Sequence, residues 1–330
     1  MRNTRIQFHN KQTGVALLTA LLVVSMAAII AVNITERQQY DIRRMQNLLF
    51  NQQAFYYATG GEAWAQGLLY KDHQSDQKNN GTDNLYEDWA QPLPLTLIEN
   101  GSILGEITDL QGLFNINNLY IDDRTDPTQL TRLSQQKQLF DRLLTTLEIN
   151  TSITPAIIDW LDKDTDSTFP DGAEDDVYLQ MTPAYRTANR RMDNPSELML
   201  IAGINTEIYN KLKPFISALP EATTININTA PAEVIAALSS QLDIDEATNI
   251  VKDRTSAFDS IQDFLRNTQG YAQNINNYQG NVTPLINVTT RYFKVTAEVK
   301  IDNINKQLIS ILKRNTDSSV NIISRSPGDN

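Results

Sequence analysis

The chain has 330 residues, a formal net charge of −11 at pH 7 and no cysteine, and its two histidines are His9 and His73. This length is enough for one large or two modest domains with hydrophobic cores, while the composition excludes disulfides, thiolate metal sites and a cysteine nucleophile and disfavours a histidine triad or a multi-histidine zinc site. The negative charge repels nucleic acid and acidic lipid, but it suits cation binding or a basic partner.

An N-terminal segment without charged residues runs from Gln12 to Thr35, over 24 positions. An apolar helix of about 20 residues crosses a hydrocarbon core of about 30 Å, so this segment is long enough to span a membrane once. Arg2, Arg5 and Lys11 precede it without any acidic residue, which keeps this end in the cytoplasm. The large C-terminal part is therefore expected to lie outside the cytoplasm.

The same helix is predicted to continue as an amphipathic one as far as Leu69. Its apolar residues recur mainly at steps of three and four: Ile42, Met45, Leu48, Leu49, Phe55, Ala58 and Trp64. A helix over residues 15–70 would measure about 80 Å at 1.5 Å per residue, far more than the thickness of a bilayer core. Only its first half can lie in lipid.

A short basic leader, Gly14 and an uncharged helix from Val15 onward resemble the class III leaders of type IV pilins and type II secretion pseudopilins. The resemblance implies that a prepilin peptidase removes leader residues 1–14 on the cytoplasmic face and N-methylates Val15. An ordinary secretory signal has a shorter apolar stretch of about 7–15 residues. The alternative is a plain signal anchor, which predicts an intact Met1 or the loss of the whole apolar run.

Most members of these families carry Glu as the fifth residue after the cut, whereas this chain has Thr19. A Glu inside a bilayer is costly unless it is paired, and in such filaments the expected partner is the N-terminal ammonium of a neighbouring subunit. A subunit without a neighbour above it loses nothing when this Glu is absent. The class that lacks the Glu is the K-class minor pseudopilin, which is placed at the filament tip.

The rest of the chain is predicted to form three blocks. Residues 71–126 begin with a polar loop, and "EDWAQPLPL" and "SILGEITDLQGLFNINNL" then indicate short strands. Asp126 and Pro127 are typical of a helix start, and helical patterns dominate residues 127–281. Residues 282–315 contain two alternating runs joined by "IDNINK", which predicts a hairpin, and residues 316–330 are expected to be a disordered tail.

Strands on both sides of a helical block indicate an insertion. The predicted fold is α+β, with a pilin-like long N-terminal transmembrane helix packed on a small antiparallel sheet and a large inserted all-α domain. K-class pseudopilins have this layout. The chain resembles them over most of its length, through "GVALLTALLVV", "EDWAQPLP", "GLFNINNL", "IIDWLDKD", "GAEDDVY", "SELMLIAGI" and "ININTAPAEVIAAL" in that order.

An acidic loop in the helical block is the candidate for a metal site. Its acids are Asp159, Asp162, Asp164, Asp166, Asp171, Glu174, Asp175 and Asp176, with Lys163 as the one cation among them. So many carboxylates repel one another unless a hard cation gathers them, and calcium takes six to eight oxygen ligands. Asp162, Asp164 and Asp166 match the first, third and fifth ligand positions of an EF-hand loop, but Ser167 and Ala173 stand where that loop has its Gly and its Glu.

The resemblance to K-class domains implies that this loop binds calcium. The ligands that it implies are Asp164, Asp166, Asp171, Glu174, Asp175 and Asp176, with Asp162 as a further candidate. Asp159 lies next to Trp160 near the end of an apolar stretch and is interpreted as a helix-end or capping residue. Under the alternative, a solvated acidic loop without metal, calcium and magnesium chelators would leave thermal stability unchanged.

Two segments, "NPSELMLIAGINTEIYNKL" and "NTAPAEVIAALSSQLDIDEATNIVKDR", look like helix-hairpin-helix units with N-caps at Ser196 and Thr229. Such hairpins hold phosphates in DNA-repair proteins, but the acidic domain and its export favour a packing role and argue against nucleic-acid binding. The sequence has no G-x-S-x-G, P-loop, H-E-x-x-H or G-x-G-x-x-G motif, and its acids cluster in one local loop. We therefore expect a protein that is not an enzyme.

These observations predict a structural minor pseudopilin of the K class at the tip of the type II secretion pseudopilus, supporting export of folded proteins from the periplasm across the outer membrane. The resemblance implies a single span in the inner membrane and a periplasmic C-terminal domain. It also implies partners: the I- and J-class minor pseudopilins, other pseudopilins, the prepilin peptidase, and the secreted substrates or the outer-membrane channel. The rival hypothesis is a signal-anchored periplasmic binding or hydrolytic domain.

Overall fold

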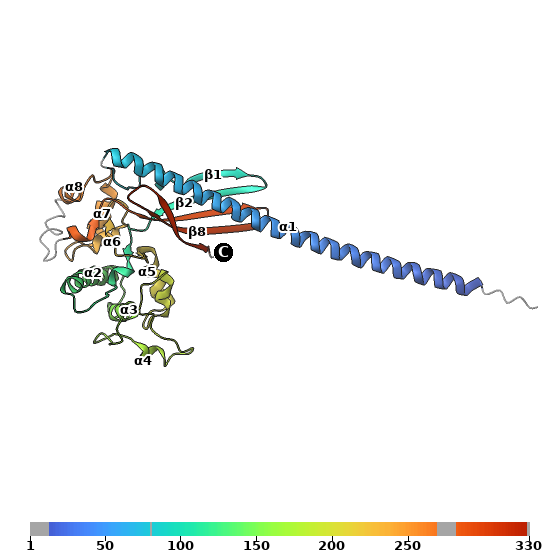
Figure 1. Cartoon of the computed structure of the whole chain (residues 1–330), viewed down its shortest axis with the longest axis horizontal. Helices are drawn as coiled ribbons and strands as arrows, with labels where there is room; N and C mark the ends of the chain where they lie inside the picture. Colours follow the sequence, from blue (N-terminus) through green and yellow to red (C-terminus); the bar gives the residue numbers. More distant parts are fainter. Residues whose placement is uncertain (1–12, 80, 269–281, 329–330) are drawn as a thin grey trace, which may run out of the picture.

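The computed structural model describes residues 13–79, 81–268 and 282–328. One helix, α1 (Thr13–Asn79), has 67 residues and is therefore about 100 Å long. Its first half extends away from the rest of the molecule, and its second half lies along a sheet (Figure 1). The predicted leader, residues 1–14, falls almost wholly outside the described residues.

The long helix ends later than predicted. Residues 71–79 were expected to be part of a polar loop, but they continue α1 to Asn79. No Pro or Gly interrupts the sequence between Tyr70 and Asn79, so nothing local stops the helix. A tertiary ion pair also stabilises this end, because Arg314 Nη1 lies 3.0 Å from Asp72 Oδ2.

The sheet has five antiparallel strands in the order β1-β2-β7-β8-β9. Their bounds are β1 (Leu93–Ile98), β2 (Gly101–Asp109), β7 (Tyr292–Ile301), β8 (Ile304–Arg314) and β9 (Val320–Pro327). The predicted hairpin is confirmed as β7 and β8, which turn at Asp302 with a φ of 51°. Because β2 and β7 are neighbours in the sheet, the block between them is an insertion, as predicted.

Small residues let α1 approach this sheet closely. Ala54, Ala58 and Ala65 are at most 1% exposed and pack against apolar residues of β7 and β8. Gly61 belongs to the same face, since a Cβ there would lie 3.2 Å from Ile103 Cδ1 on β2. This alternation of small side chains on the helix with branched ones on the sheet fixes the position of α1 over the strands.

The prediction of a disordered tail is wrong for most of its length. Strand β9 pairs with β8 from Leu308 to Arg314, and Arg325 binds the buried Glu62 of α1 through two contacts of 2.8 and 2.6 Å. Polar composition suggested disorder, but the open edge of β8 supplies main-chain partners, and Val320 and Ile322 pack on the α1–sheet core.

The inserted domain has short helices around a separate hydrophobic core. The α-helices are α2 (Pro127–Thr146), α3 (Ile153–Leu161), α4 (Asp175–Tyr178), α5 (Thr206–Leu212), α6 (Ala232–Ala236), α7 (Ile244–Asp253) and α8 (Ile261–Asn267). The 3₁₀ helices in the described residues are η1 (Asp88–Ala90), η2 (Ile116–Leu119), η3 (Pro195–Leu200), η4 (Lys213–Phe215) and η5 (Thr283–Leu285). Asp126 caps α2 as predicted, its side chain accepting a hydrogen bond from the Thr128 amide.

The domain is not purely helical and does not begin at residue 127. Two short parallel pairs join it to its flanks: β3 (Phe114–Asn115) with β4 (Ile216–Ser217), and β5 (Ile225–Asn226) with β6 (Ile286–Asn287). Phe114 belongs to the helical core and stacks on Phe140 with a centroid distance of 5.1 Å. Long-range contacts of this kind leave no periodic signal in a two-residue strand, so the sequence pattern missed them.

The predicted caps of the two hairpin units are also corrected. Asn194 caps η3 instead of Ser196, and Pro231 occupies the cap position of α6 instead of Thr229. The Thr229 hydroxyl instead donates to Asp109 Oδ2 over 2.6 Å, which ties the inserted domain to the end of β2. Both units therefore contribute to packing and to the junction between domain and sheet.

Candidate functional site

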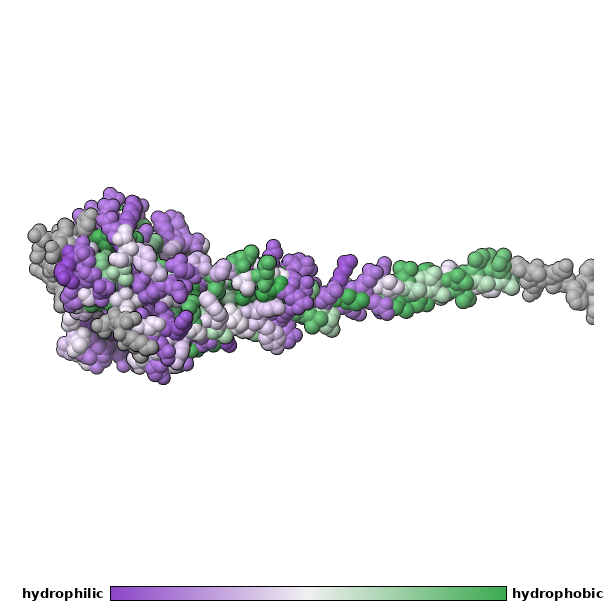
Figure 2. Space-filling view, turned by 90° about the horizontal axis from the view of Figure 1, so that it is seen from above, coloured by the Kyte–Doolittle hydropathy of each residue, from purple (hydrophilic) through white to green (hydrophobic). Residues whose placement is uncertain are grey.

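The first half of α1 is a candidate membrane segment. Among the described residues, α1 is the one helix that is long and apolar enough to cross a bilayer, and its most apolar stretch is not buried inside the protein. Figure 2 shows this apolar end standing clear of the polar head. Leucines and valines exposed at this density, such as Leu18 with 68% and Val24 with 65% exposure, are stable only in lipid or against other apolar helices.

The predicted processing site lies at the start of this helix. Gly14 and Val15 both belong to the first turn of α1, and Val15 is 61% exposed. Thr19 is exposed as well, and its hydroxyl donates to the Ala16 carbonyl oxygen over 3.0 Å. A hydroxyl satisfied in this way needs no partner from a second subunit, in contrast to a carboxylate at the same depth.

The acidic loop follows α3 and ends at the start of α4. Its side chains Asp162, Asp164 and Glu174 meet, with one carboxylate oxygen from each lying within 4.8 Å of the others. Asp162 and Glu174 are buried, with 1% and 3% exposure. Three carboxylates at this separation repel one another, so the arrangement requires a cation, a proton or an arginine.

Arg124, in the segment before α2, supplies part of this positive charge. Its Nε lies 2.9 Å from Asp164 Oδ2, and its Nη2 contacts both Asp162 and Asp159. Burial raises the pKa of Asp162 to about 6 in spite of Arg124. Burial also raises the pKa of Glu174 to about 7. A hydrogen bond from Thr187 partly offsets this rise, and the carboxylates of Asp159 and Asp162 add to it. One guanidinium is therefore not enough to neutralise the cluster.

Three buried oxygen atoms around this loop receive no hydrogen bond from the described residues. They are Oδ1 of Asp162, Oε1 of Glu174 and Oδ1 of Asn189. The Asn189 side chain belongs to the same place, because its Nδ2 donates to the Asp164 carbonyl oxygen over 3.2 Å. Buried acceptors without donors are rare, and an all-oxygen set of this kind fits a hard cation such as calcium.

The structure brings together only part of the predicted ligand set. Asp164 and Glu174 join the cluster with Asp162, whereas Asp166 and Asp171 are exposed on the loop. Asp175 instead lies 2.8 Å from the Arg186 guanidinium, and Asp176 is exposed and accepts from the Val177 amide in the first turn of α4. Sequence reasoning missed Asn189 and Arg124, since neither is close to the loop in the chain.

Asp159 lies near the end of α3, as predicted, but it does not cap that helix. Its fully buried carboxylate accepts hydrogen bonds from the Thr168 amide at 2.9 Å and from the Thr168 hydroxyl at 2.5 Å. The acidic loop is thus anchored at its centre to the helix from which it leaves. This anchor turns the chain back, so that Glu174 can reach Asp162 and Asp164.

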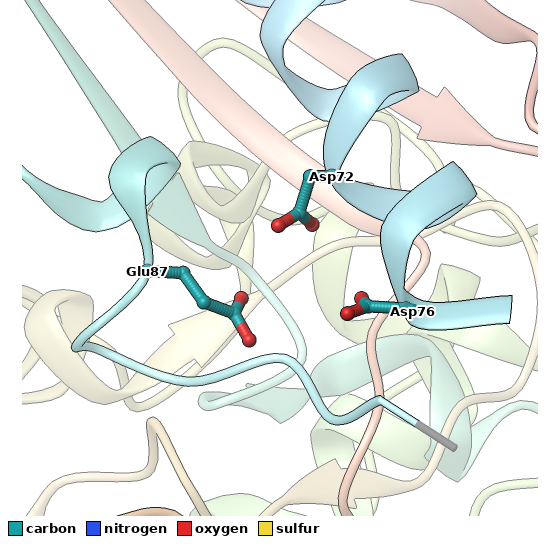
Figure 3. A group of neighbouring side chains, drawn as sticks. All are labelled: Asp72, Asp76 and Glu87. Carbon is teal, nitrogen blue, oxygen red and sulfur yellow. The ribbon is translucent and has the colours of Figure 1, made fainter. Parts of the chain in front are cut away.

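A second group of carboxylates lies where α1 ends. Asp72 and Asp76 on α1 and Glu87, the residue before η1, direct their carboxylates toward one another (Figure 3), with one oxygen of each within 4.8 Å of the others. The sequence did not indicate this group, because residues 71–79 were assigned to a loop.

Protonation explains the second group. Burial, followed by the charge of Asp76, raises the pKa of Asp72 to about 7, against the effect of Arg314. Burial and the charge of Asp72 raise the pKa of Glu87 to about 8 in spite of its hydrogen bond from Trp89. In the described part of the chain, no side-chain atom of this trio is both buried and without a partner.

Comparisons with known proteins point to one family. Residues 112–221 and 225–282 match two profiles, each described as type II secretion system (T2SS), protein K. The type II secretion system protein K of Pseudomonas aeruginosa is 37% identical over 325 residues, covering 96% of this chain and 93% of that protein. The protein of the same name from Aeromonas hydrophila is 30% identical over 329 residues, covering 96% and 98%.

The fold has a counterpart among solved structures. A chain in the crystal structure of the GspK–GspI–GspJ complex from the enterotoxigenic Escherichia coli type 2 secretion system superposes with a TM-score of 0.74, at 22% identity, covering 87% of this chain and 100% of that one. This likeness confirms the predicted α+β architecture of a long helix, an antiparallel sheet and a helical insertion. Since relatives at 30% identity or more align over almost its whole length, the chain belongs to the type II secretion system protein K family.

Proposed function

We propose that this chain, a minor pseudopilin of the type II secretion system, forms the tip of the pseudopilus together with the I- and J-class minor pseudopilins. The observation that carries the proposal is the contrast within α1: its first half is not buried by any other described part of the chain, and its second half bears a sheet and a large inserted domain. Helices of sibling subunits would pack along the free half. The inserted domain would obstruct a further subunit above it.

Support for the I- and J-class partners comes from the solved complex, in which the K, I and J proteins of enterotoxigenic Escherichia coli assemble together. The proposed location is the inner membrane, with a single span and the sheet and inserted domain in the periplasm. Partners beyond these two would be the other pseudopilins, the prepilin peptidase, and the secreted substrates or the outer-membrane channel.

Processing at Gly14 is the part of the proposal that one measurement tests. Mass spectrometry of the protein extracted from membranes should find a chain that starts at N-methylated Val15. An intact Met1, or a chain that has lost the whole apolar run, would instead support a signal-anchored domain. Thr19→Glu provides a second test, because a tip subunit given the missing carboxylate should allow further subunits to assemble beyond it, and unchanged assembly would contradict this role of Thr19.

We further propose that the acidic loop binds calcium through Asp162, Asp164 and Glu174, with the Asn189 side-chain oxygen as an additional ligand. The donor-free oxygens of Asp162, Glu174 and Asn189 support this set. A bound divalent cation would neutralise carboxylates that Arg124 leaves partly unbalanced. The residues Asp166, Asp171, Asp175 and Asp176, which the family resemblance also implied, have a weaker claim because they are exposed or engaged elsewhere.

Calcium should raise the melting temperature of the full-length protein in detergent, and a calcium chelator should reverse the effect, because a ligand that binds only the folded state stabilises it. Glu174→Gln and Asn189→Leu should each weaken the calcium-dependent shift. Asp176→Asn is the matched control, since it removes an exposed acid from the same loop. A shift that is absent in the unmodified protein, or that is equal in Asp176→Asn and Glu174→Gln, would contradict the assignment.

A further inference from the structure

The acidic loop carries an aromatic side chain that the fold leaves in solvent. Phe169 is 92% exposed, more than any other large apolar side chain among residues 15–76, 81–268 and 282–328. A single apolar residue on a surface is ordinary when its backbone is free to move. Phe169 differs from that case, because the turn that carries it is held on both sides.

The turn around Phe169 is built from short hydrogen bonds. The Gly172 amide donates to the Thr168 carbonyl oxygen over 2.7 Å, which closes a turn with Phe169 and Pro170 at its outer corner. Thr168 is in turn bound to the buried carboxylate of Asp159. Gly172 is required there, since a Cβ would lie only 2.4 Å from the Thr168 amide nitrogen.

The position of this turn leaves it open to a partner. Helices α3 and α4, which border the acidic loop, lie at the end of the inserted domain that is farthest from α1 and the sheet (Figure 1). Subunits that pack along α1 would therefore not cover it. No side chain of residues 15–76, 81–268 and 282–328 covers the ring, which keeps nearly all of its area in water.

The surroundings of the ring define the chemistry of that partner. Residues 162–176 contain seven acidic side chains. Asp162, Asp164 and Glu174 form the proposed cation site, and Asp175 pairs with Arg186, which leaves Asp166, Asp171 and Asp176 as the exposed acids of this segment. Asp166 and Asp171, which flank Phe169, are both exposed. An aromatic side chain in an acidic frame fits an apolar pocket that is bordered by lysine or arginine.

We propose that Phe169 anchors a docking site for a protein outside the bundle of α1 helices, whose surface offers an apolar pocket with a basic border. The closed turn fixes the backbone that carries the ring, which lowers the conformational entropy of the main chain that is lost in the complex. The acidic frame accelerates the encounter and sets the orientation. The proposal rests on the secretion role, because its first test measures the amount of exported protein. The docking site around Phe169 does not depend on calcium binding or on the tip position.

Secretion by cells that carry the variant in place of the native chain provides the first test. Phe169→Ser should reduce the amount of exported protein in the medium by about tenfold, the factor expected for losing one buried aromatic contact. Phe169→Trp should retain export. The control is Leu130→Ser, which removes a side chain of 43% exposure on α2 of the same domain.

The variants should melt at the temperature of the native protein and still co-purify with the I- and J-class subunits. If the native protein itself did not co-purify with the I- and J-class subunits, the proposed pseudopilus role would be overturned. Unchanged export by cells with Phe169→Ser would overturn only the docking site. The two failures are therefore distinguishable.

Photocrosslinking identifies the chemistry of the occupant. A benzophenone amino acid at position 169 of the full chain, irradiated in intact cells, should attach to a peptide from an apolar pocket with lysine or arginine at its border. High salt should lower the yield in isolated membranes. Attachment to a second copy of this chain, to lipid, or to a surface with an acidic border would overturn the proposal.

Discussion

Strand β9 is held to α1 by a buried carboxylate, and this contact allows a quantitative prediction. Glu62 has 3% side-chain exposure, and Arg325 contacts both of its oxygens, at 2.8 and 2.6 Å, while the Ser310 hydroxyl donates to one of them. Burial raises the pKa of Glu62, but the hydrogen bonds from Arg325 and Ser310 outweigh it and lower the pKa overall. The charged form is therefore the one that the fold stabilises.

Arg325→Ala would leave this carboxylate buried with Ser310 alone. Removing one partner of a fully buried ion pair costs about 3–5 kcal/mol. Since the Arg325 side chain is 45% exposed, water screens the pair, and we expect a smaller loss of about 2 kcal/mol in the free energy of unfolding. Glu62→Ala/Arg325→Ala should be less destabilised than Arg325→Ala, because no charge is then left without a partner.

Urea unfolding of the full-length protein in detergent measures these differences. Tryptophan fluorescence follows both cores, because Trp89 is 1% exposed in the α1–sheet core beside Leu69 and Phe293, and Trp160 is 3% exposed in the core of the inserted domain. Hydrogen exchange of residues 320–327 shows whether β9 opens by itself. A loss below about 0.5 kcal/mol for Arg325→Ala, or a double variant whose loss equals the sum of the two single losses, would refute the assigned coupling.

Three further predictions concern other parts of the fold. The folded-state pKa values of Asp72 and Glu87 are about 7 and about 8, above their ordinary values of 3.8 and 4.5, so the folded chain holds protons that the unfolded chain releases. The stability that these protons contribute is lost as the pH rises from 3.8 through about 8. Urea unfolding of Glu87→Gln should therefore depend less on pH over this window than unfolding of the native protein. Ala58→Leu introduces a larger side chain where α1 meets the sheet, so it should cost about 1–3 kcal/mol in the same assay, and a Leu with no effect would mean that α1 is not closely packed there. Phe140→Ala opens a cavity in the core of the inserted domain and should lower its stability by about 3–5 kcal/mol, measured by hydrogen exchange in α2, while exchange in β7 and β8 should stay unchanged if the two cores are independent.

Local patterns in the sequence were sufficient for several elements. Three elements were predicted correctly: the helix through the uncharged run up to Thr35, the helix start at Asp126, and the alternating strands around Asp302. Each of them depends on neighbours within a few residues. The insertion was also predictable, since strands before and after a helical block must meet to form a sheet. The family resemblance added the overall layout.

Contacts between distant residues produced the errors. Residues 71–79 are polar enough for a loop, yet Arg314 binds the helix there through Asp72. The tail is polar enough for disorder, yet β8 and Glu62 order it as a strand. The charged partners, Arg314 for Asp72 and Glu62 for Arg325, each lie more than two hundred residues away along the chain, where no periodicity can reveal them. Strand β8 is next to the tail in the sequence, and it adds main-chain pairing that the polar composition of the tail did not indicate.

The same division applies to the acidic loop. The sequence by itself determined that many carboxylates would be crowded into a short segment after α3. Its spacing suggested Asp162, Asp164 and Asp166 as oxygen ligands, of which the structure brings together Asp162 and Asp164. Only the tertiary structure decided which other groups join Asp162 and Asp164. The hydrogen bond from the Thr168 amide to Asp159 reverses the chain and brings Glu174 back to them. Asn189 and Arg124 reach the same place from separate segments. Charge repulsion depends on distance in space, and in a loop this distance is set by its anchors.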